Sequence, residues 1–393
     1  MPEPSVAIPA EEFATRRSAA ADRARAADLD GLLICARGGG TVDRYGDVMY
    51  LSNFYTSFPY TPDHAGHWNG RAHGFIILPV NGAPTLITDV PDDGRIRFDD
   101  GEIIYTDFVL DATVEALERA GLARARVGLV GTDVIPLSFH NHIVGALPNL
   151  HLSPADTILT DLRKIKSPAE IEMLRQASRI GSGMIDAMMA AVAPGATHGE
   201  IVAAGMAELA PQGGILYNSF MAHGHDGDPP HYVRMNFPTW SSPNRLVEGD
   251  WFRLGVSGMV GGYVFDLSRA RSIGRATNRQ VDIFEAAISC VEAGIEAVRP
   301  GATAGSLAEA GLGRQRELGF PMDGVFSGMG HGVGLGWDAP WLTPDEPTEI
   351  TPGMVLCFER TVRRGGLLGD FEETVLVTET GVERLTTARR RYW

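Results

Sequence analysis

The sequence is poor in cysteine, in positive charge and in long apolar runs, and each shortage argues against a class of protein. Its three cysteines, Cys35, Cys290 and Cys357, show no CxxC spacing, which speaks against a disulfide framework and fits a reducing compartment. No apolar run approaches the ~18–20 residues that span a bilayer. The polar N-terminus lacks the apolar stretch of a signal peptide. We therefore expect a cytoplasmic protein without a membrane partner.

The charge balance is acidic. There are 34 Lys and Arg against 49 Asp and Glu, which gives a formal net charge of −15 at pH 7. Nucleic acids and anionic membranes attract basic surfaces, so neither is an expected partner. The 393 residues, 44% of them hydrophobic, are enough to bury a large core and to form two or three domains.

Residues 1–158 alternate between helical and strand patterns, which is typical of an α/β domain. Helices are expected at 10–28, 136–147 and 111–123, the last with Asp111 as its N-cap. Short apolar runs predict strands at 31–35, 49–51, 74–78, 85–87 and 126–130. Residues 80–83 carry the signal of a hairpin turn between two of these strands.

A second domain is expected over residues 159–393. Ser167 is the expected N-cap of its first helix, Pro168 occupies the first helical position, and Glu170 completes a capping box. Apolar residues then recur at the three- and four-residue spacing of an amphipathic helix.

This second domain contains an internal duplication. Residues 192–199 and 298–305 share the pattern Val-x-Pro-Gly-Ala-Thr-x-Gly. In each copy a long helix is expected before Pro-Gly and another after the threonine, with Thr197 or Thr303 as its cap. Two such halves imply a pseudo-symmetric α+β domain, and a site between them would take residues from both.

One histidine and three carboxylates lie on or beside short apolar runs, where strands are expected. They are Asp266 after a Gly-Gly turn, His331 in a glycine-rich loop, Glu359 at the end of an apolar strand, and Glu372 before another. Such oxygen and nitrogen donors suit one divalent ion of Mn, Fe, Co or Zn. Taken singly, each residue also fits a solvated turn, a structural histidine or an exposed strand end.

Several motifs together resemble the pita-bread superfamily of methionine aminopeptidases, Xaa-Pro aminopeptidases, prolidases and creatinases. The resemblance covers about residues 160–385. It rests on Leu-Arg-Lys-Ile-Lys-Ser-Pro-Ala-Glu at 162–170, Asn-Arg-Leu-Val-Glu-Gly-Asp at 244–250, Gly-His-Gly-Val-Gly at 330–334, Pro-Gly-Met-Val at 352–355 and Glu-Glu-Thr-Val-Leu-Val-Thr at 372–378. The N-terminal domain is similar in placement to that of creatinase and prolidase.

The resemblance implies a set of metal ligands and two departures from it. The superfamily's metallopeptidases hold two ions on Asp, Asp, His, Glu and Glu, and the four candidates above match the second to fifth of these ligands. The first falls at Gly255, which has no side chain, so we expect either one ion or none. The peptidases' substrate histidine falls at Asp338, which argues against ordinary aminopeptidase action.

The resemblance also suggests groups that contact the substrate. His231 is similar in position to the histidine that acts as acid or base in prolidases and creatinase, with His223 and His225 as rivals. Arg71 lies where creatinase binds a substrate carboxylate across a dimer interface, so we expect a homodimer whose N-terminal domain contributes to the partner's site. Asp338 and Tyr263 are further candidate substrate contacts.

These residues predict a hydrolase that cleaves a C–N bond in a small, carboxylate-bearing, non-peptide substrate. With a metal ion on Asp266, His331, Glu359 and Glu372, Glu359 would be the base and His231 would stabilise the oxyanion. Without metal, Glu359 or Glu372 would activate water and His231 would donate the proton. The alternatives are an Xaa-Pro-type metallopeptidase with an altered site, a lyase, and a non-catalytic binding protein.

Overall fold

The computed structural model describes residues 7–38, 44–227, 231–234, 245–322 and 326–393, with 231–234 described by their backbone alone. The chain divides into two compact units, residues 7–163 and residues 164–393. The boundary expected from the sequence, between residues 158 and 159, falls inside the last helix of the first unit, Asp156–Arg163.

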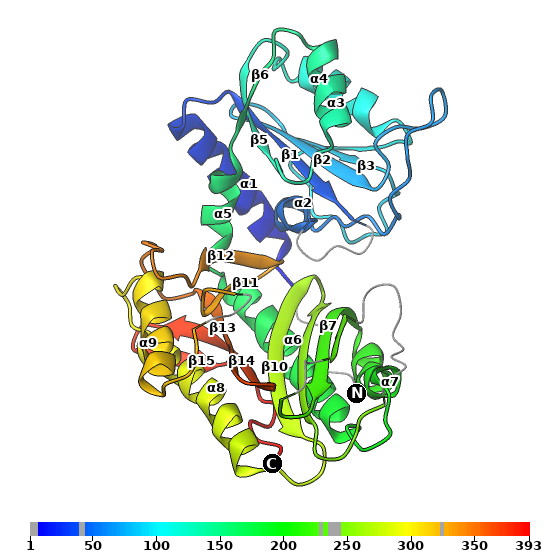
Figure 1. Ribbon diagram of the computed structural model, residues 1–393. Helices are drawn as coiled ribbons and strands as arrows, with labels where there is room; N and C mark the ends of the chain where they lie inside the picture. Colours follow the sequence, from blue (N-terminus) through cyan, green and yellow to red (C-terminus); the bar gives the residue numbers. More distant parts are fainter. Residues whose placement is uncertain (1–6, 39–43, 228–230, 235–244, 323–325) are drawn as a thin grey trace. The chain divides into compact units, whose positions relative to one another are not determined.

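The N-terminal unit is a six-stranded sheet with helices around it (Figure 1). The strand order is β4-β3-β2-β1-β5-β6, with β1 parallel to β5 and antiparallel to β2. The strands are β1 (Gly31–Arg37), β2 (His73–Pro79), β3 (Thr85–Thr88), β4 (Glu102–Tyr105), β5 (Arg126–Val130) and β6 (His151–Pro154). The helices are α1 (Ala10–Ala26), α2 (Gly46–Ser52), α3 (Val109–Arg119), α4 (Leu137–Ala146) and α5 (Asp156–Arg163). This mixed sheet with helices agrees with the expected α/β class.

Two local predictions in this unit are wrong. Residues 49–51 belong to helix α2 and not to a strand, because an apolar run this short does not distinguish the two. Asp111 is not an N-cap: α3 begins at Val109, and Asp111 lies in its first turn. An acid there still favours the helix, since it faces the positive end of the helix dipole.

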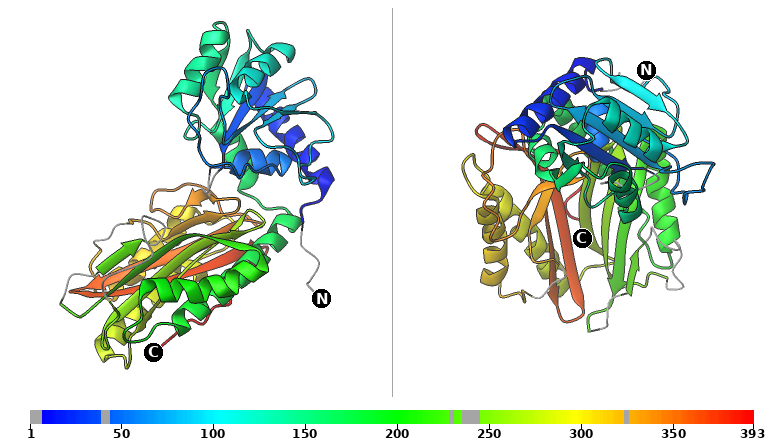
Figure 2. Two further views of the ribbon diagram at one scale, coloured as in Figure 1. Left: turned by 90° about the vertical axis from the view of Figure 1, so that its right-hand side faces the viewer. Right: turned by 90° about the horizontal axis from the view of Figure 1, so that it is seen from above.

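The C-terminal unit has two sheets, each covered by a pair of helices (Figures 1 and 2). The first half holds α6 (Pro168–Ala190), α7 (His198–Leu209), the short 3₁₀ turn η1 (Ala210–Gln212), and the sheet β10-β9-β7-β8. Its strands are β7 (Gly214–Gly224), β8 (His231–Arg234), β9 (Trp251–Val260) and β10 (Tyr263–Ser272).

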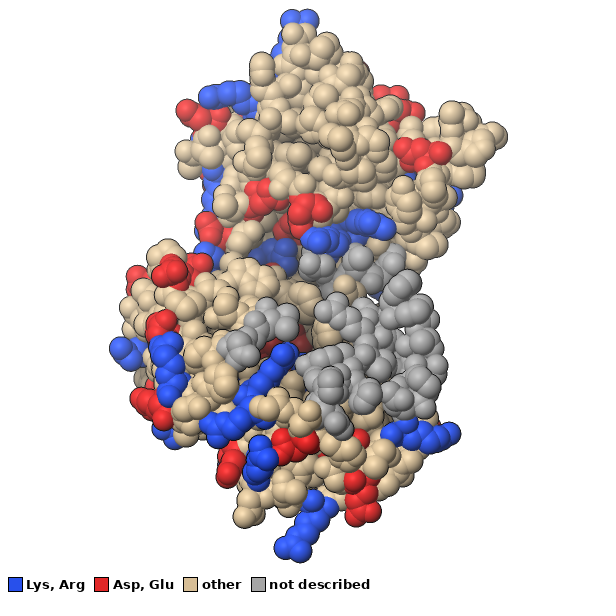
Figure 3. Space-filling view, in the orientation of Figure 1, with Lys and Arg blue, Asp and Glu red and all other residues tan. Residues whose placement is uncertain are grey.

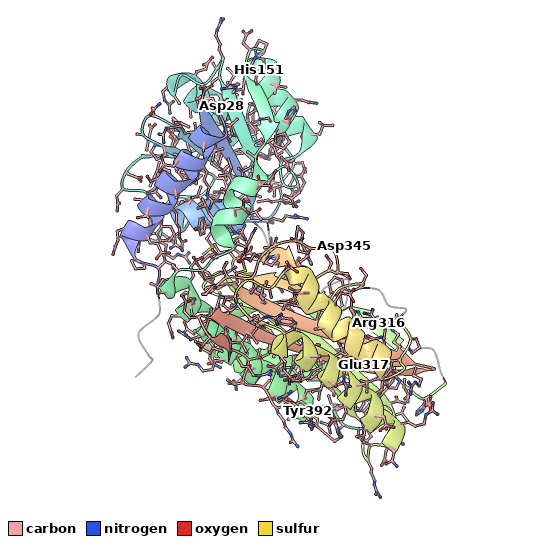
Figure 4. All side chains as sticks on the ribbon, turned by 90° about the vertical axis from the view of Figure 1, so that its left-hand side faces the viewer. Asp28, His151, Arg316, Glu317, Asp345 and Tyr392 are labelled. Carbon is pink, nitrogen blue, oxygen red and sulfur yellow. The ribbon has the colours of Figure 1, made fainter. Side chains whose placement is uncertain are left out.

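The second half repeats this plan. Helices α8 (Asn278–Glu296) and α9 (Ala304–Glu317) cover the sheet β12-β11-β13-β14-β15. Figure 4 shows these helices in front of the strands, with Arg316 and Glu317 labelled at the end of α9. The strands are β11 (Gly330–Val333), β12 (Trp337–Trp341), β13 (Val355–Arg364), β14 (Leu367–Thr378) and β15 (Gly381–Arg384).

The sequence signals for these halves agree with the structure. Ser167 and Glu170 form a capping box at α6, with Pro168 in the first turn, and Thr197 and Glu200 form another at α7. Thr303 caps α9 by accepting a hydrogen bond from the Ser306 amide. One apolar core lies between α6, α7 and the first sheet, and another lies between α8, α9 and the second.

One face of the described surface carries charges of both signs. In Figure 3, acidic and basic side chains are interspersed over the described part of this face, and no broad basic area is visible there. Among the described helices, none combines the length and the apolar content that a bilayer crossing needs.

Candidate metal centre

Four strands of the C-terminal unit bring the candidate ligands together. Asp266 lies on β10, His331 on β11, Glu359 on β13 and Glu372 on β14. Ligand atoms of Asp266, His331 and Glu372 all lie within 4.8 Å of one another. Glu359 faces Glu372 directly across the antiparallel β13–β14 pair. The site therefore takes Asp266 from the first half of the unit and the other three residues from the second.

Two local expectations about these residues are corrected. His331 lies on a short strand within the glycine-rich segment and not in a loop, and its backbone pairs with Cys357 of β13. Glu359 lies in the middle of β13 and not at its end, since the strand continues to Arg364. The mid-strand position holds its carboxylate beside that of Glu372, which neighbouring strands make possible.

Asp266 is held by hydrogen bonds to both carboxylate oxygens. The Ser257 hydroxyl donates to Oδ1 over 2.8 Å, and the Trp337 indole Nε1 donates to Oδ2 over 2.5 Å. His331 Nε2 lies 3.6 Å from the same Oδ2. The carboxylate plane is thus fixed before any ligand binds, which is how outer groups orient metal ligands.

Glu372 is fixed through its side chain and its backbone. The Cys357 thiol lies 3.2 Å from Glu372 Oε1 and donates to it. Arg269, fully buried on β10, donates to the Glu372 carbonyl over 2.6 Å and pairs with the Glu373 carboxylate over 2.7 Å. These contacts join β10 to β14, so that Asp266 and Glu372 are held close together.

The carboxylates are in an environment that disfavours their charge. Burial raises the pKa of Asp266, and the nearby His331 opposes that shift. Burial and the charges of Asp266 and Glu359 raise the pKa of Glu372. Burial also raises the pKa of Glu359 to about 7, although His331 lowers it. Clustered buried acids of this kind need protons or a cation.

The donor set fits a divalent cation. Three buried groups converge, with one imidazole and two carboxylates, and the half-buried Glu359 adjoins them. Oxygen and nitrogen donors of this kind suit Mn, Fe, Co or Zn. Asp266, His331 and Glu372 would hold the ion, and Glu359 lies beside them.

Tyr263 and Asp338 were expected to contact the substrate, and the structure gives both other partners. Tyr263 lies on the face of β10 opposite Asp266, is almost fully buried, and donates its hydroxyl to Glu170 over 3.1 Å. Asp338 is buried and pairs with Lys166 Nζ over 3.3 Å. Both side chains thus have partners inside the protein, and their predicted contacts with the substrate stay predictions.

The three candidate histidines differ in what the structure describes. His223 Nδ1 lies 3.2 Å from Asp250, and His225 Nδ1 lies 2.7 Å from the same carboxylate. Strand alternation turns His223 away from the face that carries Ser257, because Asn218 pairs with Ser257 and His223 is five residues further along β7. The backbone of His231 pairs with that of His223, and its side chain is outside the described part. Its role stays a prediction.

Arg71 belongs to the N-terminal unit. Its guanidinium lies 3.3 Å from Asp107 Oδ1 and stacks on Phe58, 3.8 Å from the ring centroid. Close by in the chain, the rings of His64, His67 and Trp68 contact one another. The predicted contact of Arg71 with a substrate carboxylate stays a prediction.

Three groups around the site were missed from the sequence: Ser257, Trp337 and Cys357. A signal for Ser257 was present. Gly261 and Gly262 form the turn of the β9–β10 hairpin, both with positive φ, and a two-residue turn fixes the pairing of the strands. Counting back from that turn places Ser257 opposite Asp266. No local pattern marked Trp337, which reaches Asp266 through the tertiary fold.

Comparison with known proteins agrees with this architecture. Residues 172–379 match metallopeptidase family M24, and residues 16–165 match the creatinase/prolidase N-terminal domain. The fold is similar to that of a prolidase from Pyrococcus horikoshii, with a TM-score of 0.78, 20% identity, and coverage of 96% of this chain and 99% of that chain. The predicted fold class, an α/β domain followed by a pita-bread domain, is confirmed.

Curated relatives include several hydrolases. The chain is 29% identical over 242 residues to the Xaa-Pro dipeptidase of Pyrococcus furiosus, which is 60% of this chain and 66% of that protein. It is 27% identical over 288 residues to the ectoine hydrolase of Halomonas elongata, 67% of this chain and 69% of that protein. It is 25% identical over 366 residues to the creatinase of a Bacillus species, 86% of this chain and 85% of that protein.

Proposed function

Because the chain belongs to metallopeptidase family M24 and carries a creatinase/prolidase N-terminal domain, we propose that it cleaves a C–N bond of a small, carboxylate-bearing substrate with one divalent ion. Its membership makes it a hydrolase of the creatinase and aminopeptidase superfamily. The observation that carries the finer proposal is the convergence of Asp266, His331 and Glu372 within 4.8 Å. Gly255, which pairs with Ser268 two residues from Asp266, offers no further acid.

Each residue of the site has a role in this proposal. A divalent ion, when bound, would acidify a water molecule and polarise the carbonyl group of the substrate. Asp266 stays in one orientation because Ser257 and Trp337 hold both of its oxygens. Glu359, half-buried beside Glu372, accepts the proton of the attacking water and returns it to the leaving nitrogen. His231 is carried over from the resemblance alone as the donor to the developing oxyanion, because its backbone pairs with His223, which lies on the face of the sheet opposite Ser257.

A non-peptide substrate is favoured by the position of Asp338. The resemblance puts a peptide-holding histidine at this place, whereas here a buried acid pairs with Lys166. The side chain at this position therefore offers no hydrogen-bond donor to a peptide carbonyl. Xaa-Pro dipeptide hydrolysis remains the second candidate, because a relative with that name is 29% identical to this chain over 242 residues.

The proposal is tested by substrate and metal together. Purified protein would be stripped with a chelator, reloaded with Mn, Fe, Co or Zn, and assayed on a prolyl dipeptide, creatine and ectoine, the last two chosen from the names of relatives. We expect hydrolysis of a non-peptide compound that is lost with chelator and restored by one ion per chain. Activity that survives with less than ~0.2 ion per chain would refute the metal. Products without solvent ¹⁸O would instead identify a lyase.

Two further expectations belong to this proposal. We propose a cytoplasmic homodimer in which Arg71 binds the substrate carboxylate in the partner's site. Light scattering after size exclusion tests the dimer. An Arg71→Gln variant whose KM for the carboxylate substrate rises tenfold or more, with little change in kcat, would support that contact.

A further inference from the structure

We propose that the positively charged guanidinium of Arg253 takes the place of a second metal ion and so limits the site to one divalent ion. The guanidinium lies beside Gly255 and forms an ion pair with Asp370. This inference rests on the proposed metal centre. It concerns a residue that none of the sequence patterns singled out, and it identifies the group that lies next to position 255, which has no side chain.

The register of the strands places these groups together. Arg253, Gly255 and Ser257 occupy alternate positions of β9 and so share the face that carries the Ser257–Asp266 hydrogen bond. On β13 and β14, Thr361 pairs with Asp370 two positions beyond the Glu359–Glu372 pair. The acidic face of β13 and β14 thus continues from Glu372 to Asp370.

The Arg253 side chain folds back along its strand toward the site. A Cβ atom built at Gly255 would have Arg253 Nη2 as its nearest neighbour, at 3.5 Å. The same guanidinium lies 2.6 Å from Asp370 Oδ2. Asp370 is itself oriented by the Thr361 hydroxyl, which donates to its Oδ1 over 2.8 Å. A Cβ at position 255 would meet the guanidinium only at ordinary contact distance, so it is a side chain extending beyond Cβ, such as a carboxylate, that would compete with the guanidinium for this place.

The Arg253 charge acts on the site. Four carboxylates, Asp266, Glu359, Glu372 and Asp370, gather here with one guanidinium. One divalent ion together with Arg253 would balance most of this negative charge, and a second ion beside the guanidinium would meet strong repulsion.

Comparison with the other buried arginines separates this role from a structural one. Arg269 donates to the carbonyls of Ser268, Glu372, Ala388 and Arg389 and to the Glu373 carboxylate. Arg360 donates to Gln315 and to two backbone carbonyls. In contrast, Arg253 Nε is buried and has no hydrogen-bond partner among the described residues, and the side chain is 20% exposed. Its positive charge is therefore less fully compensated by internal hydrogen bonds.

The test is the number of bound Mn²⁺ ions per chain, measured by equilibrium dialysis with elemental analysis and by electron paramagnetic resonance. We expect about one uncoupled ion in the wild type and in Gly255→Asp, where the new acid would pair with Arg253. The double variant Arg253→Ala/Gly255→Asp should bind two ions with a spin-coupled signal. Gly255→Ala is the matched control, because its Cβ would meet atoms only at ordinary distances of 3.5 to 3.8 Å.

A second measurement covers the case in which the double variant does not fold. In Arg253→Ala alone, removal of the positive charge should tighten the single Mn²⁺ site about tenfold, while Arg253→Lys should leave its affinity within about threefold of the wild type. Thermal unfolding would confirm that each variant is folded.

The outcomes separate the inference from the function on which it rests. Zero Mn²⁺ in every variant would refute the proposed metal centre itself. Two coupled ions in the wild type, or one ion in a folded double variant, would refute only the role of Arg253. An unchanged or weakened Mn²⁺ affinity in folded Arg253→Ala would refute it as well.

Discussion

Replacing Trp337 with phenylalanine should loosen the metal centre without disturbing the fold. The indole Nε1 donates to Asp266 Oδ2 over 2.5 Å, and the ring packs against His331 with a centroid distance of 5.9 Å. Phenylalanine retains an aromatic ring for this packing but has no N–H. Asp266, buried and with its pKa raised by that burial, would lose one of two donors that fix its carboxylate.

The size of the effect follows from the kind of bond. A hydrogen bond to a charged group contributes roughly 1.5–3 kcal/mol, and loss of an outer-shell partner typically weakens metal binding by about 10- to 100-fold. We therefore expect the Mn²⁺ dissociation constant of Trp337→Phe to rise by about that factor. Isothermal titration calorimetry on chelator-treated protein measures it directly.

The chain supplies a matched control in Trp341. Its ring also packs against His331, with a centroid distance of 5.4 Å, but it is 45% exposed and its indole makes no bond to a candidate ligand among the described residues. Trp341→Phe should change the Mn²⁺ dissociation constant by about twofold at most. Equal affinities of the two variants would show that the Asp266 hydrogen bond does not support the metal site, and the reasoning would fail.

Three further variants test the site's support and the buried polar groups. Gly330→Ala should lower the free energy of unfolding by about 2–4 kcal/mol and displace His331. The reason is that Gly330 has a φ of 132° and an added Cβ would lie 1.8 Å from the Cys357 carbonyl oxygen. Thermal unfolding and metal content measure the two effects, and native values for both would contradict the prediction. Tyr263→Phe should lower the free energy of unfolding by about 1 kcal/mol, because the hydrogen bond to Glu170 is lost, and should leave KM unchanged. A raised KM would identify Tyr263 as a substrate contact. The two ring nitrogens of His198 lack hydrogen-bond partners in the described structure, and burial lowers its pKa to about 4. The unfolded chain therefore binds a proton at His198 more readily than the folded protein does. The free energy of unfolding should for this reason fall by about 3 kcal/mol as the pH falls from 6.5 to about 4. His198→Phe should reduce this pH dependence in urea titrations at pH 7 and 4.5, and an unaltered dependence would rule His198 out.

The sequence predicted most of the scaffold because its signals are local. Ser167, Pro168 and Glu170 specify a helix start by bonds that close within four residues. The repeated Pro-Gly-Ala-Thr segments likewise specify α7 and α9. Residues 49–51 failed because three apolar residues carry no period, and packing decides whether such a run becomes helix or strand.

The position of a residue in a family motif does not by itself fix the residue's partner inside the protein. Asp338 lies where the resemblance puts a substrate residue, yet Lys166, at the start of the same unit, takes its carboxylate. Tyr263 is three residues from Asp266, but strands alternate their faces, so an odd separation turns its side chain toward Glu170 and α6. The parity of the separation, which is readable from sequence, already places Tyr263 on the face of β10 opposite Asp266.

The alternation of side chains along a strand also explains how the β9–β10 hairpin carries both Ser257, which bonds to Asp266, and Arg253, the proposed cation of the site. Once the turn at Gly261 and Gly262 fixes the register, Ser257 must face Asp266, and Gly255 and Arg253 must follow on the same side. A shift of the register by one residue would turn all three away from the acids at once. The pairing of Glu359 with Glu372 fixes Thr361 opposite Asp370 in the same way. Arg253 and Asp370 therefore meet because two independent registers place them at the same end of the acidic face, beside a position, Gly255, where no longer side chain competes for the space.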